Sequence, residues 1–201
     1  MIGFAQGRGK QGVRGVADAR ERLIAACLDL LRTKGLKRFT MDELALRAGM
    51  SKRTVYRYFG SKEEIIEKAV ESLMYKVAWQ AQEIIQSEKD PKEAVADMLE
   101  YLIRQASSIL TRETLDELRS HYPFLWQKID RLRTERLEWL ARELVARSPR
   151  QEVKSIDLRI IASSIIASVQ AVVNPDFILD NNLTFEETVT QLTTFLYLAF
   201  F

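Results

Sequence analysis

The stretch TMDELALRAGMSKRTVYRYFGSKEE, residues 40 to 64, predicts two short helices and the start of a third. Thr40 and Glu43 have the spacing of a capping box, in which each side chain satisfies a backbone N–H group of the other residue, so a helix begins at Thr40. Gly49 ends this helix, because glycine tolerates the left-handed conformation that a tight turn requires. Ser51 then caps a second helix.

The spacing of Ala45, Gly49 and Val55 is that of a helix-turn-helix, with a small residue where the helices approach, glycine in the turn and an aliphatic residue that packs the second helix onto the first. Val55 and Phe59 form the apolar side of the second helix. Its outer side is basic and aromatic, which suits contacts to phosphates and base edges. The residues of this outer side are Lys52, Arg53, Tyr56 and Arg57.

A third helix is predicted to begin directly after the second. Gly60 breaks the second helix, and Ser61 with Glu64 has the spacing of another capping box. The free N–H groups of this helix start and Lys62 are then expected to point the same way as the outer side of the second helix.

The sequence TVYRYFGSKEEII, together with the Thr-capped helix and the Ala-Gly-Met-Ser turn before it, resembles the signature of the TetR family of bacterial transcription regulators. The match covers about residues 18 to 66. The resemblance implies an all-helical dimer in which the helices after residue 61 enclose a ligand pocket. It also implies that an occupant of this pocket shifts the long connecting helix and changes the spacing of the two DNA-binding heads.

Affinity for DNA comes mainly from phosphate contacts, whereas sequence preference requires contacts to base edges. We expect Thr40, Tyr58 and Lys62 to meet phosphates. Tyr58 has an alternative structural role beside Phe59, and Ser51 is more securely a helix cap, although its counterpart in the resembling family often also contacts DNA. The candidate readers of base edges are Lys52, Arg53, Thr54, Tyr56 and Arg57.

Charge is distributed unevenly over a chain whose net charge is only +2. Residues 1 to 62 hold 14 Lys or Arg against 5 Asp or Glu, which leaves 16 against 23 for residues 63 to 201. The basic third is therefore the expected nucleic-acid side. A hydrophobic fraction of 47% is that of a globular protein. No apolar run reaches the roughly 18 residues of a membrane span, and no secretory signal is visible, so the cytoplasm is the expected compartment.

Catalytic and metal-binding motifs are missing from the sequence. One histidine and one cysteine make a zinc site improbable, and no cofactor, nucleotide or nucleophile motif is present. Cys27 lies at helical spacing with Leu23 and Leu30, so we interpret it as a core residue rather than a redox sensor. The chain is therefore not expected to be an enzyme.

The remaining chain predicts an all-α fold of about nine helices. Residues 1 to 17 are a glycine-rich basic arm, either an unstructured leader or a DNA contact, and residues 18 to 62 form the head, whose first helix is capped by Asp18 and Glu21 and ends near Gly35. Residues 63 to 201 form the ligand-binding and dimerisation domain. Its predicted helices cover about 61–87, from 90 onwards, 111–121, 124–147, from 148 onwards, 155–173 and from 184 to the terminus.

Two details of these helices are specific enough to test. Ser148 and Gln151 have capping-box spacing, and Asn174-Pro175 is predicted to end a helix and lead into a loop. Charges of mixed sign along 124–147 indicate a solvated face, which includes Arg131, Arg133, Arg136 and Arg142.

An apolar and aromatic pocket, if present, suits a hydrophobic or amphipathic small molecule. Aromatic and Met residues on helices are also ordinary core residues. His121 is either a polar anchor or an exposed loop residue. The candidate pocket residues are Tyr75, Trp79, Met98, Tyr101, Leu102, Tyr122, Phe124, Trp126 and Ile166.

Small residues at helical spacing in 155–173 allow close helix packing, and two-fold symmetry would double the half-site that one helix-turn-helix reads. We expect the last two helices to pair with those of a second copy, although a purely intramolecular core is the alternative. The expected interface residues are Ile161, Ser164, Ile165, Ser168, Val172, Leu192, Phe195 and Leu196.

Three functions remain possible on this sequence. The leading one is a dimeric repressor that a small molecule releases from a pseudo-palindromic operator in double-stranded DNA. The second is an architectural or interaction protein without ligand control, and the third is an enzyme in a helical bundle. Release from DNA by a small molecule distinguishes the first function from the other two.

Overall fold

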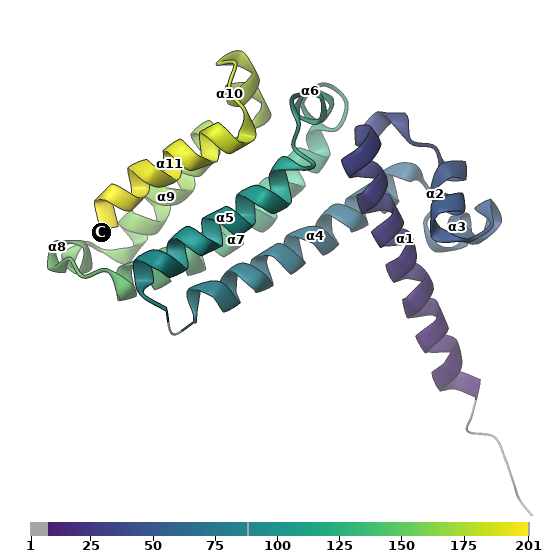
Figure 1. Ribbon diagram of the computed structural model, residues 1–201, viewed down its shortest axis with the longest axis horizontal. Coiled ribbons are helices and arrows are strands. Elements are labelled where there is room, and N and C mark those ends of the chain that lie inside the picture. The colour runs from purple at the N-terminus through teal and green to yellow at the C-terminus, as the bar shows by residue number, and fades with distance from the viewer. Residues whose placement is uncertain (1–7, 88, 201) are drawn as a thin grey trace, which may run out of the picture. The chain divides into compact units, whose positions relative to one another are not determined.

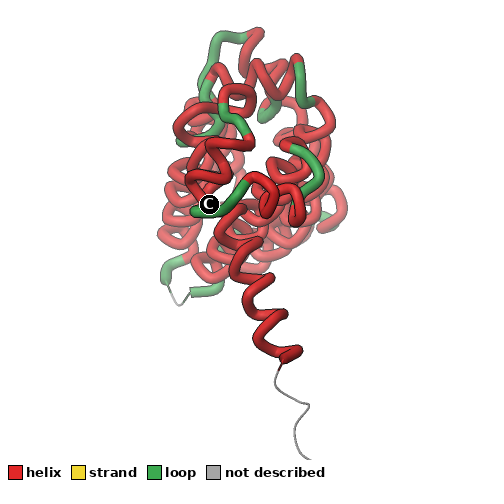
Figure 2. The backbone as a smooth tube through the Cα atoms, turned by 90° about the vertical axis from the view of Figure 1, so that its right-hand side faces the viewer, coloured by secondary structure: helices red, strands yellow, loops and turns green. Residues whose placement is uncertain are grey.

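The computed structural model describes residues 8–87 and 89–200, which form helices joined by short loops (Figure 1). Within these residues no strand is present (Figure 2), so the all-α prediction is confirmed. The helices are α1 (Arg8–Arg38), α2 (Met41–Ala48), α3 (Lys52–Tyr58), α4 (Lys62–Ile85), α5 (Pro91–Ser107), α6 (Arg112–Ser120), α7 (Pro123–Arg147), α8 (Gln151–Ser155), α9 (Leu158–Val172), α10 (Pro175–Asp180) and α11 (Phe185–Phe200).

The chain divides into two compact units, Met1–Ser72 and Leu73–Phe201. The division falls within α4, beyond the predicted boundary at residue 62. Ile65, Ile66 and Ala69 on the first turns of α4 are buried and belong to the first unit. Helix α4 therefore contributes one end to each unit.

The first unit has a core made by one face of each helix. Leu23 and Cys27 of α1, Leu44 of α2, Val55 of α3 and Ile65 of α4 are fully buried. This confirms the predicted apolar positions of the helix-turn-helix. Burial of a large aliphatic side chain contributes about 1.5–3 kcal/mol, so these few residues hold the short helices in place.

Helix α1 differs from the prediction at its beginning and agrees near its end. It already includes residues 8–17, and Asp18 lies inside the helix, where its carboxylate is 3.7 Å from Arg22 one turn later, so Asp18 is not the predicted cap. Gly35 has φ 75° and ψ −173°, which interrupts the helix where the sequence predicts its end. Residues 1–7 of the predicted basic arm lie outside the described residues.

Among the described residues of the second unit, three apolar clusters can be distinguished. Ala141 of α7 packs with Ile161 and Ile165 of α9 and Phe200 of α11. A second cluster joins the end of α4 to α5 and includes Met98, and a third joins α6 to α10. The last helices therefore bury one face against α7 within the same chain.

Eleven helices are present among the described residues instead of about nine, and α10 occupies a segment where the sequence predicts a loop. Helix α9 ends at Val172. Asn174 then caps α10 by accepting a hydrogen bond from Phe177 N at 2.8 Å, and Pro175 occupies the first helical position. Asp157 starts α9 by accepting from Arg159 N at 2.8 Å, which splits α8 from the predicted 155–173 helix.

Ser148 does not form the predicted capping box. It follows the end of α7, and its buried hydroxyl donates to the Phe200 carbonyl at 2.7 Å, while Arg150 precedes α8 without a side-chain cap bond. Satisfying a buried carbonyl is worth more than capping an exposed helix of five residues.

No helix in the described part of the chain is both long and apolar enough to span a bilayer.

Candidate nucleic-acid interface

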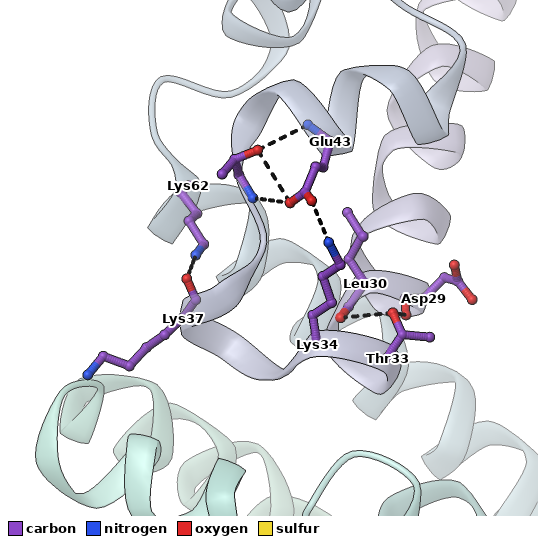
Figure 3. A network of polar contacts seen from close by, with 8 residues as sticks. Asp29, Leu30, Thr33, Lys34, Lys37, Glu43 and Lys62 are labelled. Carbon is purple, nitrogen blue, oxygen red and sulfur yellow. Dashed lines mark hydrogen bonds and ion pairs between the residues drawn. The ribbon is translucent and has the colours of Figure 1, made fainter.

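The start of α2 is held by the predicted capping box. Glu43 N donates to Thr40 Oγ1 at 3.2 Å, and Thr40 N donates to Glu43 Oε2 at 2.8 Å. Lys34 of α1 pairs with the other carboxylate oxygen of Glu43, as Figure 3 shows. This bond is the main reason that the pKa of Glu43 lies below its usual value, and the Thr40 backbone adds to it. Thr40 is exposed beside this cap, where its role as a phosphate contact stays a prediction.

The turn between α2 and α3 is made by Gly49, whose φ of 65° and ψ of 39° are left-handed. Gly49 N donates to the Leu46 carbonyl at 3.1 Å, and Met50 N donates to the Ala45 carbonyl at 2.9 Å. These bonds satisfy the last carbonyls of α2. The turn therefore fixes the direction in which α3 leaves.

Helix α3 has the two faces that the sequence predicts. Ser51 caps it by accepting from Thr54 N at 3.1 Å. Val55 and Phe59 are almost completely buried. The opposite face is exposed to solvent and consists of Lys52, Arg53, Tyr56 and Arg57.

The exposed face of α3 is basic, although one of its cations has a partner within the head. Lys52 Nζ donates to Asp42 Oδ2 at 2.8 Å, and this hydrogen bond raises the pKa of Lys52. The guanidinium of Arg57 lies 5.2 Å from the centre of the Tyr58 ring. Tyr58 is half-buried, so both of its predicted roles, structural and phosphate-binding, agree with its position.

The first residue of α4 is tied to the segment before α2. Lys62 Nζ donates to the Lys37 carbonyl at 2.8 Å (Figure 3) and lies 4.3 Å from the centre of the Phe39 ring. At the same helix start, Glu64 N donates to Ser61 Oγ at 3.1 Å. The Glu64 carboxylate accepts from Gly60 N at 2.6 Å, one residue before the position expected for a capping box.

Sequence reasoning omitted two cations that adjoin the cap of α2. Lys37 and Arg38 are exposed and directly precede Phe39 and Thr40. Their position before a helix N-terminus, where a phosphate is favoured, was the available signal.

Within the described part of the chain, the candidate pocket residues lie in several separate places. Met98 is buried in the cluster of α4 and α5, with Leu102 packed against it, whereas Tyr75 and Trp79 are exposed and lie one turn apart on α4. Tyr122 and Phe124 form an edge-to-face pair at 6.2 Å. Tyr101 and Ile166 are partly buried in α5 and α9.

A hollow of about 460 Å³ lies elsewhere in the second unit, between α6 and α10. Its lining is mostly charged, and none of its residues is a predicted pocket residue. They are Arg112, Glu113, Asp116, Arg119 and Leu179. His121, at the end of α6, is exposed, as one of its two interpretations expected.

Arg133 is not on a solvated face, in contrast to the prediction for α7. Only 16% of its side chain is exposed. Its guanidinium lies 5.4 Å from the centre of the Trp126 ring, pairs with Asp130 and donates to the Val173 carbonyl at 2.9 Å. Burial lowers the pKa of Arg133, and the bond to Asp130 acts against this effect. The reason for the error is that α9 covers this part of α7.

The expected interface residues divide between the chain's own core and its surface. Ile161 and Ile165 are buried against α7, and Leu196 packs against the same cluster, so the inward side of α9 is already covered. Ser164 and Phe195 are exposed, and Ser168, Val172 and Leu192 are partly exposed. Large exposed apolar side chains on these two helices also include Ile160 and Leu198.

The first unit thus has a short helix that presents cations and an aromatic ring to solvent, held by a tight glycine turn on a buried apolar seam. This arrangement defines a helix-turn-helix DNA-binding protein with a second, all-helical unit.

Comparison with known proteins shows which family the DNA-binding head resembles. Residues 23–69 match the family model described as "Bacterial regulatory proteins, tetR family". The HTH-type transcriptional regulator YvaF of Bacillus subtilis, described as uncharacterized, is 27% identical over 88% of this chain and 93% of its own length. The nucleoid occlusion factor SlmA of Vibrio campbellii is 28% identical over 77% of this chain and 82% of its own length.

Among solved structures, a protein of Saccharomonospora viridis in complex with choline superposes with a TM-score of 0.61 at 15% identity. The match covers 90% of this chain and 96% of that one. Residues 23–69 of the chain thus match the TetR family, and the chain is a DNA-binding transcription regulator rather than an enzyme.

Proposed function

We propose that the protein is a dimeric repressor that binds a pseudo-palindromic operator through α3 and leaves it when a hydrophobic or amphipathic small molecule binds the second unit. The observation that carries this proposal is the exposed face of α3. Arg53, Tyr56 and Arg57 are exposed to solvent, while Val55 on the opposite side of the helix is fully buried. A helix held in this way can enter a major groove without losing its packing.

Dimerisation is supported by apolar side chains at the surface of the last helices. Phe195 and Leu198 of α11 are 68% and 69% exposed, and Ile160 of α9 is 61% exposed. Exposed apolar residues gathered on two helices favour contact with another protein surface. A second copy is the partner that a two-fold symmetric operator requires.

Control by a small molecule is supported by the fold and by one relative. The Saccharomonospora viridis protein, which shares this fold, is in complex with choline. A ligand acts on DNA binding only if it prefers the conformation that does not bind DNA, by about 1.4 kcal/mol for each tenfold loss of operator affinity.

Selection of bound duplexes from a random pool tests the DNA-binding part of this proposal. The expected product is one pseudo-palindromic sequence. Arg53→Ala and Arg57→Ala should each lose about 1–3 kcal/mol of operator affinity and relax preference at one position in each half-site. Arg131→Ala, an exposed arginine of the second unit, is the matched control. Equal loss on all sequences would instead make Arg53 or Arg57 a phosphate contact.

An alternative function without ligand control is favoured by the similarity to the nucleoid occlusion factor SlmA. Mapping of bound sites on the chromosome distinguishes the two functions. A repressor is expected at a few promoters, and an architectural or interaction protein without ligand control at many sites outside promoters.

A further inference from the structure

The neighbours of Arg133 satisfy its guanidinium only in part. Nη1 donates to the Val173 carbonyl and Nη2 pairs with Asp130. Nε is buried and has no hydrogen-bond partner within the described residues. A buried N–H group without an acceptor is unfavourable and rare in native structures, so this one requires a physical explanation.

The surroundings of Arg133 are polar at one end and aromatic at the other. Trp126 lies beneath the guanidinium, and Tyr122 precedes Trp126 by one turn of α7. On α9, Gln170 Nε2 donates to Asp130 Oδ2 at 3.0 Å, and Ile166 lies one turn before Gln170. Three predicted pocket residues, Tyr122, Trp126 and Ile166, therefore adjoin this polar group in sequence and helical register.

We propose that Arg133 is the anchor for the carboxylate of an apolar effector, which accepts a hydrogen bond from Nε while its apolar body lies along Trp126 and Tyr122. This inference rests on the proposed function, because it assumes that the second unit binds an effector. It goes further by naming the effector's chemical class, an aliphatic or aromatic carboxylic acid.

A carboxylate fits this position better than a neutral or cationic group. The planar guanidinium offers N–H groups in a fixed fork that matches a carboxylate, and hydrogen bonds between charged groups are stronger than neutral ones. The side chain is largely shielded from water, which strengthens the attraction. A cation, in contrast, would meet the positive charge of Arg133, which already covers the Trp126 ring.

Asp130 gives the proposal a second, opposite consequence. Its carboxylate pairs with the guanidinium of Arg133 and would repel the carboxylate of an effector bound to the same guanidinium. Asp130→Asn should therefore tighten the binding of an acid, whereas Arg133→Met should weaken it. A purely structural ion pair would show no such opposition, because both substitutions would only disturb the packing of α7 on α9.

The test uses the full chain and two pairs of probes, decanoate with decanamide and 1-naphthoate with 1-naphthamide, in titration calorimetry. Wild type should bind at least one acid about tenfold or more tightly than its amide. Arg133→Met should lose this preference, and Arg133→Lys, which keeps the charge but not the Nε–H, should reduce it. Asp130→Asn should increase it, and Arg131→Met, an exposed neighbour, should leave it unchanged.

If Arg133→Met fails to fold, the preference for an acid over its amide is measured on Arg133→Lys, which keeps the positive charge. Equal affinity for each acid and its amide, no detectable binding of either acid, or an unchanged preference in Arg133→Lys would overturn the inference. Operator binding is measured on the same samples. If the wild-type protein binds its operator but does not prefer the acids, only this inference fails, whereas absence of operator preference rejects the proposed function itself.

Discussion

Lys62 is both a tether and a predicted phosphate contact. Its ammonium group uses one N–H for the Lys37 carbonyl. An ammonium group has three donors, so it can also bind a phosphate. We predict that Lys62→Met weakens binding equally on all sequences and lowers the slope of log affinity against log salt by about 0.9.

Affinity measured over a series of salt concentrations checks this prediction, with Lys76→Met, an exposed lysine of α4, as the control. An unchanged slope accompanied by a lower stability of the head would show that Lys62 is only a tether.

Cys27 is a second residue with a measurable consequence. Burial raises the pKa of its thiol to about 12, against a smaller opposite effect of Lys62. Because the thiolate is the reactive form, Cys27 should resist a thiol reagent at pH 8 in the native protein and react at once in denaturant. Absorbance of the released thiol reagent follows the reaction. Rapid modification of the native protein would contradict the buried position.

The same pKa predicts how stability depends on pH. The folded chain holds the Cys27 proton more tightly than the unfolded chain, in which the pKa of the thiol is near 9.0. The contribution of the protonated thiol to stability is therefore complete below pH 9 and is lost as the pH rises towards 12.

At the scale of elements, the turn between α2 and α3 depends on a single backbone conformation. A Cβ added at Gly49 would have no atom within 4 Å, so Gly49→Ala is opposed by its left-handed φ alone. We predict a loss of about 1–2 kcal/mol of unfolding free energy, and a smaller loss for Gly49→Asn. Chemical denaturation measures both. Equal stability of Gly49→Ala and wild type would show that the turn relaxes.

Gly60→Ala is the informative comparison, because its Cβ would lie 3.3 Å from Glu64 Oε2. Here the carboxylate that accepts from Gly60 N must move, so the loss comes from a displaced side chain rather than from backbone strain.

Helix starts that depend on neighbouring residues could be predicted from the sequence. Thr40 with Glu43 forms the expected reciprocal cap, Thr184 with Glu187 forms another where a helix start was predicted, and Ser51 and Thr111 cap α3 and α6. The capping box predicted for Ser148 was wrong because the hydroxyl donates to the carbonyl of Phe200, which is distant in sequence. The cap at Asp157 was missed because it lies inside an apolar run that was interpreted as one helix. The cap at Asn174 was missed because the following proline was interpreted as the end of a helix rather than a start.

The same distinction separates the two functional regions. The exposed face of α3 follows from helical spacing within seven residues, so its members could be named. The environment of Arg133 depends on contacts of α7 with residues 40 positions later in the chain, which no local pattern contains. The pocket residues were therefore chosen by residue type alone, and they lie in separate clusters.

At the scale of the whole molecule, the exposed face of the last two helices predicts the oligomeric state. Phe195→Asp places a charge on this face, and two copies of the charge would meet across a two-fold axis. We predict a monomer that binds the operator much more weakly, since burial of each phenylalanine contributes about 1.5–3 kcal/mol. Light scattering after size exclusion gives the mass, and Gln127→Asp, at an exposed position of α7, is the control. A Phe195→Asp protein that remained dimeric would locate the interface elsewhere.

The pair of Lys52 with Asp42 has a consequence for selectivity. A lysine that is already paired with a carboxylate neutralises a phosphate less completely. Fewer of the counterions condensed on the DNA are then released when it binds. The entropy gained on any duplex is thereby reduced, while the hydrogen bonds available only at the correct bases are unaffected. We therefore expect the fixed negative charge of Asp42 beside α3 to weaken binding to arbitrary DNA and to leave base discrimination mainly to Arg53 and Arg57.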